Sequence, residues 1–314
     1  MIIADETYIA FKPPPHRRIS CQIFIVLLTL IIALRVRSLP DAGPTPRVRW
    51  AAIDAGQPGK PNPMSSTVAS ERTAASDLFS SAESSLGIRL LPGALSMIAG
   101  SVDVIGFLEL GGLFTAHITG NLVVLAAHVA TGRAMPLAPI LAVPVFIAVL
   151  GLTRLAAAGL QDVSRATLRP LLALQLVLLV SFLVVNVAAG PFRDPNALVA
   201  VLAGMLGVAA MAVQNALVQI SLVGAPATAV MTTDITKFMM DLGAILFRSD
   251  PDEVARAASR AKGTWPAILG FTVGCSLGAI LEATIGPWSS ALPTALGVLA
   301  FGTGLRVPSI RPAQ

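Results

Sequence analysis

From residue 89 to residue 305 the chain alternates between long apolar runs and short breaks of Gly, Pro and charged residues. The runs approach the roughly 20 residues with which a helix crosses a bilayer. Backbone groups inside lipid must be bonded within their own segment, which favours helices. We therefore expect an all-α integral membrane protein with about eight transmembrane helices, although six or seven also fit the pattern. The predicted spans lie near residues 90–110, 113–131, 136–159, 170–189, 197–223, 226–247, 265–285 and 288–305.

Residues 1–87 differ in composition from the rest of the chain. A Pro-rich stretch at 40–63 is followed by a Ser-, Thr- and Ala-rich stretch at 65–85, and such segments bury too little apolar surface to fold alone. We expect this region to be disordered, or to be an over-extended reading frame if translation starts at Met64. Residues 19–34 are mostly apolar but shorter than a full span, so they are a candidate anchor.

The composition narrows the class of protein. Hydrophobic residues make up 54% of the chain and charged residues 12%, whereas a soluble domain has about 25% charged residues. A soluble enzyme is therefore excluded. The two cysteines, Cys21 and Cys275, lie far apart, and we find no zinc, P-loop or dinucleotide motif, so we expect no enzyme activity, metal or cofactor. The net charge of +5 is scattered, which argues against nucleic-acid binding.

Basic residues indicate the orientation, because Lys and Arg concentrate in cytoplasmic loops. With eight spans, only Arg165 and Arg169 near span ends fall on the side opposite the N-terminus. Ten fall on the same side: Arg72, Arg89, Arg133, Arg193, Arg248, Arg256, Arg260, Lys262, Arg306 and Arg311. Both termini are therefore predicted to be cytoplasmic, with residues 306–314 as a cytoplasmic tail.

The membrane region is predicted to contain two repeats, residues 88–190 and 191–305. Thr119-Gly120-Asn121 aligns without gaps on Thr232-Thr233-Asp234, and the same offset places His128 on Asp241. Asp103 falls one residue out of register with Asn215. Four helices per copy would give both copies the same orientation, related by an axis along the membrane normal. Chance similarity between Gly- and Ala-rich helices is the alternative.

The motifs of the two halves resemble those of the YoaK family, small multi-pass bacterial membrane proteins of unknown function. The first half contains Gly100-Ser-Val-Asp103, Phe107-Leu108 and Thr119-Gly120-Asn121. The second half contains Met211-Ala-Val-Gln214-Asn215, Thr232-Thr-Asp234 and Phe271-Thr-Val-Gly274-Cys-Ser-Leu-Gly278. The resemblance covers about residues 90–305 and departs from the family at Thr233, where the family has Gly. It implies a multi-pass protein of the bacterial inner membrane and leaves the function open.

Charged residues in the predicted sixth span are the first candidates for function. Asp234, Lys237 and Asp241 recur at i, i+3 and i+7, so they share one helical face. Each charge at the bilayer centre costs about 2.5 to 3.5 kcal/mol on insertion scales, so such residues usually face a protein interior or water. Asp234 or Asp241 would exchange a proton or admit a cation, with Lys237 as counter-ion. A static ion pair and an interfacial amphipathic helix are the alternatives.

The predicted second span carries softer polar groups in a similar stripe. His117, Asn121 and His128 lie at i, i+4 and i+11, and histidines can pass protons near neutral pH. The two histidines are about 16 Å apart along a helix, so they cannot share a metal ion. Asp103, in the first span, needs a partner such as Lys237 or His117, and Asn215 extends the polar seam. Hydrogen bonding between helices is the alternative.

Three further features lie outside the seam. The ladder Gly270, Gly274 and Gly278 predicts close helix packing, and its match to the G-x-S-x-G pattern lies within a helix, where a nucleophile elbow cannot form. Glu109 and Glu282 lie near span ends, where they can reach headgroup water.

These features favour a transporter of a small solute or ion, with proton coupling as one option and the substrate unknown. The predicted pathway consists of Asp103, His117, Asn121, His128, Asn215, Asp234, Lys237 and Asp241. The alternative is a non-transporting scaffold or assembly protein. The expected partners are the lipid bilayer and a small solute or proton, and homo-oligomers are one option. A carrier would place the polar residues around a shared cavity, whereas a scaffold would close them into pairs and expose the glycine faces.

Overall fold

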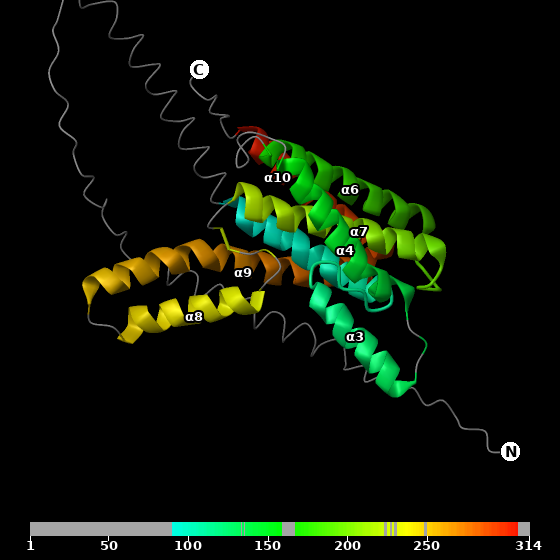
Figure 1. Ribbon diagram of the computed structural model, residues 1–314, viewed down its shortest axis with the longest axis horizontal. Helices are drawn as coiled ribbons and strands as arrows, with labels where there is room; N and C mark the ends of the chain where they lie inside the picture. Colours follow the sequence, from blue (N-terminus) through cyan, green and yellow to red (C-terminus); the bar gives the residue numbers. More distant parts are fainter. Residues whose placement is uncertain are drawn as a thin grey trace, which may run out of the picture.

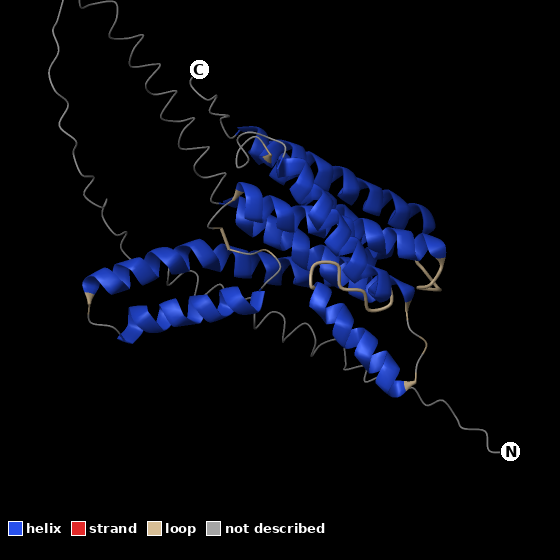
Figure 2. Cartoon of the chain, viewed as in Figure 1, coloured by secondary structure: helices blue, strands red, loops and turns tan. Residues whose placement is uncertain are grey.

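The computed structural model describes residues 90–132, 134, 136–158, 167–222, 225–226, 228, 231–247 and 250–306. The predictions for residues 1–87, including the candidate anchor and the Met64 start, lie outside these residues, as does the tail from 307 onward. The described residues form helices joined by short loops and contain no strand (Figure 2).

The helices follow one another in the order shown in Figure 1. The first is the Leu90–Glu109 helix, which is cyan and has no label in that view. After it come α3 (Ile118–Thr131), α4 (Leu137–Ala158), α6 (Leu168–Ala189), α7 (Leu198–Ser221), α8 (Met231–Phe247), α9 (Pro251–Ile285), the 3-10 helix η1 (Gly286–Ser290) and α10 (Ala291–Arg306).

Five helical stretches of the described chain are long and apolar enough to cross a membrane. They are Leu90–Glu109, Leu137–Ala157, Leu168–Ala189, Leu198–Ser221 and the stretch Pro251–Arg306, which contains α9, η1 and α10. α3 and α8 are too short for this criterion. The protein is therefore an all-helical protein of membrane type.

The Leu90–Glu109 helix and α7 run antiparallel. Gln214, in the second half of α7, donates a hydrogen bond of 2.9 Å to the carbonyl oxygen of Leu95. Gly207, one to two turns earlier in α7, packs against Val102. These helices are the first of each predicted repeat, so the halves do not share the orientation expected from the sequence. The reason lies in α3, which does not form the full second span that the apolar pattern predicts.

The predicted second span begins later than expected. Residues 113–117 are not helical, and α3 starts only at Ile118. Of its 14 residues only Asn121 is buried, and Figure 1 shows α3 leaving the bundle at an angle. The apolar run of 113–131 therefore does not behave as one continuous helix.

α6 lies between α7 and α10 and is antiparallel to both. Gln175 of α6 bonds to Gln214 of α7, and Thr294, near the start of α10, donates to the carbonyl oxygen of Leu179. At one end of the bundle Arg169 donates to the carbonyl oxygen of Leu305 at 3.0 Å. We call this the Leu90 end, because the Leu90–Glu109 helix, which packs on α9, also begins there.

The opposite end, the Glu109 end, collects the C-termini of the Leu90–Glu109 helix, α6 and α9. A Cβ added to Gly190, just after α6, would lie 2.8 Å from both Glu109 Oε1 and Pro287 Cγ. The backbone N–H of Leu137, at the start of α4, donates to Asn196 Oδ1 at 2.9 Å. α4 therefore starts at this end, and α9 finishes at it.

Glycines on α9 allow it to lie directly on the Leu90–Glu109 helix, to which it runs parallel. A Cβ added to Gly270 would overlap the carbonyl oxygen of Gly93, and one added to Gly274 would overlap that of Met97. Gly278 is likewise buried, with Ser101 facing it. Only a missing side chain permits this backbone approach.

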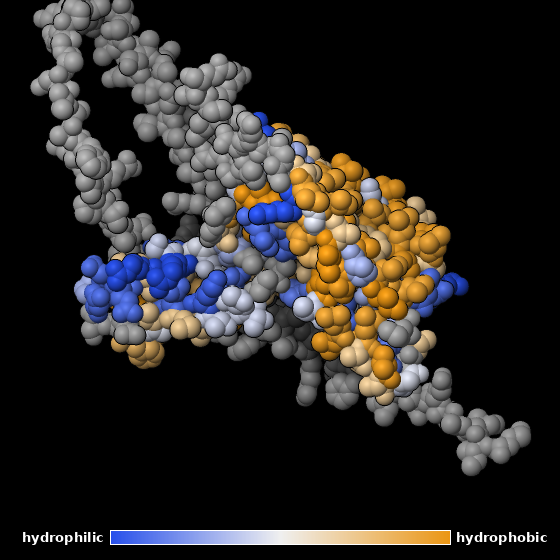
Figure 3. Space-filling model, viewed as in Figure 1, coloured by the Kyte–Doolittle hydropathy of each residue, from blue (hydrophilic) through white to orange (hydrophobic). Residues whose placement is uncertain are grey.

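The N-terminal half of α9 extends beyond the bundle and pairs with α8 to form an arm (Figure 1). The apolar pattern predicts a separate span over residues 265–285, whereas the structure shows one continuous helix from Pro251 to Ile285. Asp250 caps its start by accepting from the backbone N–H of Asp252 at 3.0 Å, and Pro251 occupies the first turn. In Figure 3 hydrophilic residues gather on this arm, while hydrophobic residues cover the bundle side that α4 and α6 form.

Candidate functional site

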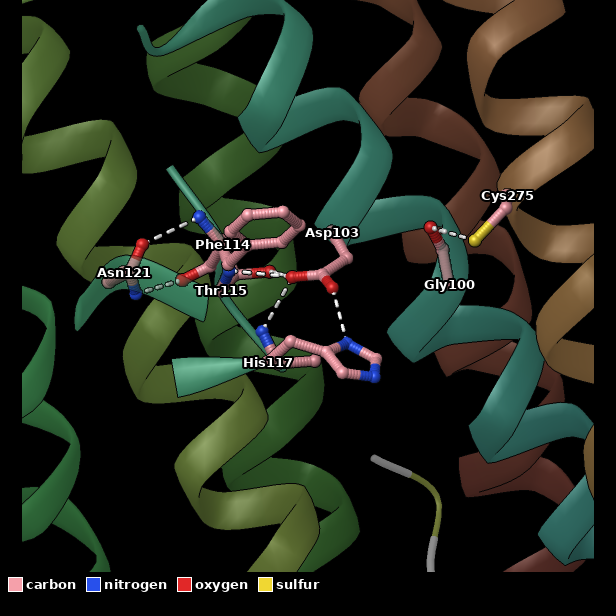
Figure 4. Close-up of polar contacts among 8 residues, drawn as sticks. Gly100, Asp103, Phe114, Thr115, His117, Asn121 and Cys275 are labelled. Carbon is pink, nitrogen blue, oxygen red and sulfur yellow. Dashed lines mark hydrogen bonds and ion pairs between the residues drawn. The ribbon is translucent and has the colours of Figure 1, made fainter. Parts of the chain in front are cut away.

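Asp103 holds the non-helical segment that follows its own helix (Figure 4). Its Oδ1 accepts hydrogen bonds from the backbone N–H groups of Thr115 at 2.7 Å and Ala116 at 2.8 Å, and from Thr115 Oγ1 at 3.2 Å. Its Oδ2 lies 2.6 Å from His117 Nδ1. Asp103 is 4% exposed. The carboxylate thus satisfies buried backbone donors that no helix would satisfy, and it folds residues 113–117 back against the bundle.

Asn121 fixes the same segment from the other side. Its Oδ1 accepts from the backbone N–H of Phe114 at 2.9 Å, and its Nδ2 donates to the Phe114 carbonyl oxygen at 2.7 Å. Asn121 is fully buried. A side-chain amide can accept from the backbone N–H and donate to the backbone carbonyl of the same residue, so residue type and role agree.

Glycines provide the space and the backbone geometry for this turn. Gly111 and Gly112 have positive φ angles of 70° and 84°, which other residues rarely adopt. A Cβ on Gly106 would lie 3.0 Å from the carbonyl oxygen of Leu113 and 3.1 Å from Thr115 Cγ2. The chain can therefore reverse after the Leu90–Glu109 helix and pack back onto it.

The two histidines are not on one helical stripe. His117 precedes α3, pairs with Asp103 and lies edge-on to Phe271 of α9, with ring centroids 5.1 Å apart. His128 lies in the last turn of α3, where its Nδ1 is 2.9 Å from the carbonyl oxygen of Ala134. The predicted histidine relay loses its geometric basis, because the segment around His117 is not helical.

The charged residues of α8 line a separate cleft between α8 and α9. The cleft has a volume of about 650 Å³, and Pro226, before α8, closes part of it. Asp241 pairs with Arg260 of α9, with an Nη2 to Oδ1 distance of 2.6 Å. The spacing along α8 predicts Lys237 as the counter-ion of Asp241, but the partner comes from the neighbouring helix. The lining residues are Ala225, Pro226, Asp234, Lys237, Met240, Asp241, Ser259, Arg260, Gly263 and Thr264.

Asp234 is the least satisfied charged group of this cleft. It is 2% exposed, and its Oδ2 has no hydrogen-bond partner among the described residues. α8 is not one of the five candidate spans. Burial raises the pKa of Asp234 above its ordinary value of 3.8, and the nearby ammonium group of Lys237 partly offsets this rise. The cleft therefore offers a buried carboxylate that a cationic group or a proton can satisfy.

A further buried polar network, centred on Gln214, joins α6, α7 and the Leu90–Glu109 helix. Gln175 Nε2 donates to Gln214 Oε1 at 2.7 Å, and Gln214 Nε2 donates to the Leu95 carbonyl oxygen at 2.9 Å and to Thr228 Oγ1 at 3.0 Å. Asn215, which the sequence analysis includes in the pathway, bonds only to its own helix at Met211 among the described residues. Gln214 and Asn215, although adjacent in the chain, therefore have separate partners.

The structure therefore brings six of the eight predicted pathway residues into two clusters and leaves His128 and Asn215 outside both. Asp103, His117 and Asn121 form one, and Asp234, Lys237 and Asp241 lie in the α8–α9 cleft; no bond described in the structure links the two. Over the described residues there is no group of three His, Cys, Asp or Glu side chains that could hold a metal ion.

The fold and these buried polar clusters define a helical membrane-type protein. A family model described as "Protein of unknown function (DUF1275)" matches residues 91–304. The match covers more than half of the chain, so the protein belongs to this family, which is uncharacterised. The comparisons found no similar protein among curated proteins and no similar solved structure.

Proposed function

We propose that this protein is a multi-pass carrier of a small solute or ion in the bacterial inner membrane. The supporting observation is that the Leu90–Glu109 helix and α7, which begin the two halves, run in opposite directions. Inverted halves with interrupted helices are a recurrent architecture of secondary transporters. The proposal includes membership of the YoaK family and a location in the bacterial inner membrane.

Corresponding non-helical segments support two related halves. Thr115 and Thr228 are 113 residues apart, the same offset that aligns Asn121 with Asp234, and both are buried. Each bonds to a side chain of the helix before it: Thr115 to Asp103 and Thr228 to Gln214. We propose that the Leu90–Glu109 helix, α4, α6, α7, α9 and α10 cross the membrane and that α3 and α8 do not.

The described basic residues support a cytoplasmic Leu90 end. Arg169, Arg256, Arg260 and Arg306 lie at or beyond that end, on α6, the arm and α10, while Arg193 follows α6 at the opposite end. Leu90 and Arg306, the two ends of the described chain, would then both lie on the cytoplasmic side, because six crossings are an even number.

The α8–α9 cleft is the proposed entry site for the solute. Its lining has two acidic and two basic side chains, and one pair, Asp241 with Arg260, is already closed. Asp234 and Lys237 remain to bind a solute. Asp234 would bind an ammonium group or a cation, and Lys237 would bind an anionic group. A small zwitterion or cation fits this arrangement best.

A non-transporting scaffold receives less support. Such a protein would present its glycine faces to other chains, but Gly270 and Gly274 already pack against the chain's own Leu90–Glu109 helix. The closed network around Asp103 suits either function.

Uptake into liposomes that contain the full chain tests the proposal. Three probes of similar size differ in charge. Alanine is a zwitterion, isopropylamine is a cation and isobutyrate is an anion. We expect the protein to take up alanine or isopropylamine in preference to isobutyrate. This uptake should be at least about tenfold lower in Asp234→Asn, because the carboxylate would no longer attract the ammonium group. The matched control is Asp252→Asn, which removes an exposed carboxylate of the same arm. Equal uptake by Asp234→Asn and wild type would refute the assigned site.

A further inference from the structure

Three helices end together at the Glu109 end, and two of them carry a carboxylate in the last turn. Glu109 is the final residue of its helix, and Glu282 lies three residues before the end of α9. α6 ends beside them at Ala189. The last carbonyl groups of a helix lack intrahelical donors and carry partial negative charge. Two acidic side chains therefore lie where the backbone already disfavours negative charge.

Glu109 is buried, contrary to the expectation that it reaches headgroup water. It is 8% exposed, and neither carboxylate oxygen has a hydrogen-bond partner among the described residues. Its Oε1 lies against Gly190, at 2.8 Å from the position of an added Cβ, so the carboxylate sits on the C-terminal end of α6. Glu282 is close enough to repel it. Glu282 Oε2 itself accepts from Ser289 Oγ at 2.5 Å.

Asn186 adds an independent sign of a missing ligand. It is fully buried, and both its Oδ1 and its Nδ2 lack hydrogen-bond partners within the described chain. A Cβ added to Gly190 would lie 2.6 Å from the carbonyl oxygen of Asn186 and 2.8 Å from Glu109 Oε1, so Asn186 lies beside Glu109 at the end of α6. Seven buried side-chain atoms of the described residues lack a partner, and four of them belong to Glu109 and Asn186. Buried polar atoms without partners are rare, and an unseen ion is one recognised cause.

We propose that Glu109, Asn186 and Glu282 form a binding site for a hard metal cation at the Glu109 end. Carboxylate, amide and hydroxyl oxygens are the ligands that Na⁺ and Ca²⁺ prefer. A cation neutralises two carboxylates for which the described residues provide no ion pair, and it is attracted by the three helix C-termini. A water molecule could satisfy the hydrogen bonds but would leave the charge uncompensated.

Thermal unfolding of the purified full chain tests this site without any transport measurement. Unfolding is followed in choline chloride, NaCl, MgCl₂ and CaCl₂ at equal ionic strength, so that screening is constant. We expect at least one metal cation to raise the Tm in a saturable manner, because a ligand of the folded state stabilises it. The comparison of NaCl with CaCl₂ distinguishes a monovalent from a divalent site.

Two variants assign the effect to these residues. Glu109→Gln and Glu282→Gln keep the side-chain shape and should weaken the apparent cation affinity about tenfold or more. Asp252→Asn, which removes an exposed carboxylate of the arm, should keep the wild-type response. The site is thus tested separately from the proposed transport function.

Two results would overturn the site. One is the absence of a saturable Tm rise with any of the three metal salts. The other is an unchanged response in both glutamine variants.

Discussion

At the scale of the residue, the Asp103 side chain accepts the hydrogen bonds of two backbone N–H groups, those of Thr115 and Ala116, that lie outside any helix. Asp103→Asn removes an acceptor oxygen and brings an N–H group toward donors, so one of its buried partners is left unsatisfied. We expect a loss of about 1–3 kcal/mol in the free energy of unfolding and faster proteolysis between residues 111 and 117. Thr115→Val is the control, because it removes only the 3.2 Å hydroxyl bond. Equal stability of Asp103→Asn and wild type would show that the carboxylate does not hold this segment.

Asp234, in contrast to Asp103, is buried although its Oδ2 has no hydrogen-bond partner among the described residues. Its pKa is raised in the folded state, so its contribution to stability is present at low pH and is lost as the pH rises from 3.8 through the raised value. Asp234→Asn should remove this pH dependence and should leave the protein at least as stable as wild type at pH 7. The measurement is Tm against pH for both proteins.

The result for Asp241→Asn provides the contrast. Asp241 is paired with Arg260, so removing its charge should destabilise the arm at pH 7 instead of stabilising it. If both variants changed stability in the same direction at pH 7, the distinction between a satisfied and an unsatisfied carboxylate in this cleft would be wrong.

At the scale of the element, the contact between α9 and the Leu90–Glu109 helix depends on glycine. Gly274→Ala places a methyl group on the carbonyl oxygen of Met97, which cannot move without moving its helix. We expect destabilisation of about 1–3 kcal/mol or more from overpacking. Gly302→Ala in α10 has no neighbour within 4 Å and should be neutral or up to about 1 kcal/mol more stable, because alanine favours helix. Thermal unfolding of both variants measures the difference.

At the scale of the molecule, Gln214 connects α6, α7, the Leu90–Glu109 helix and Thr228. Gln214→Leu keeps the size of the side chain but leaves Gln175 Nε2 without its acceptor, and we expect a loss of about 1–3 kcal/mol. Gln219→Leu, on the exposed side of α7, should change stability by less than about 0.5 kcal/mol. Similar losses in the two variants would mean that the network does not join the helices energetically.

Much of the helical framework is predictable because helices must satisfy their backbone locally in lipid. The start of the Leu90–Glu109 helix and the extents of α6 and α7 lie close to the predicted spans. The apolar pattern cannot show that residues 113–117 leave the helix, because only the buried Asp103 and Asn121 make that break favourable. For the same reason the sequence identifies both residues as candidates for function but not as partners of the backbone.

The sequence by itself determined that this chain forms helices long and apolar enough to cross a membrane, which residues are too polar to face lipid, and where glycines allow close approach. Those properties depend on residue type and local spacing. The tertiary structure decided the antiparallel packing of the Leu90–Glu109 helix and α7, the partner of Asp241, and the burial of Glu109 beside Asn186. Each of these depends on contacts between residues that are distant in the chain, because the burial and charge of a side chain are set by the helices that pack around it.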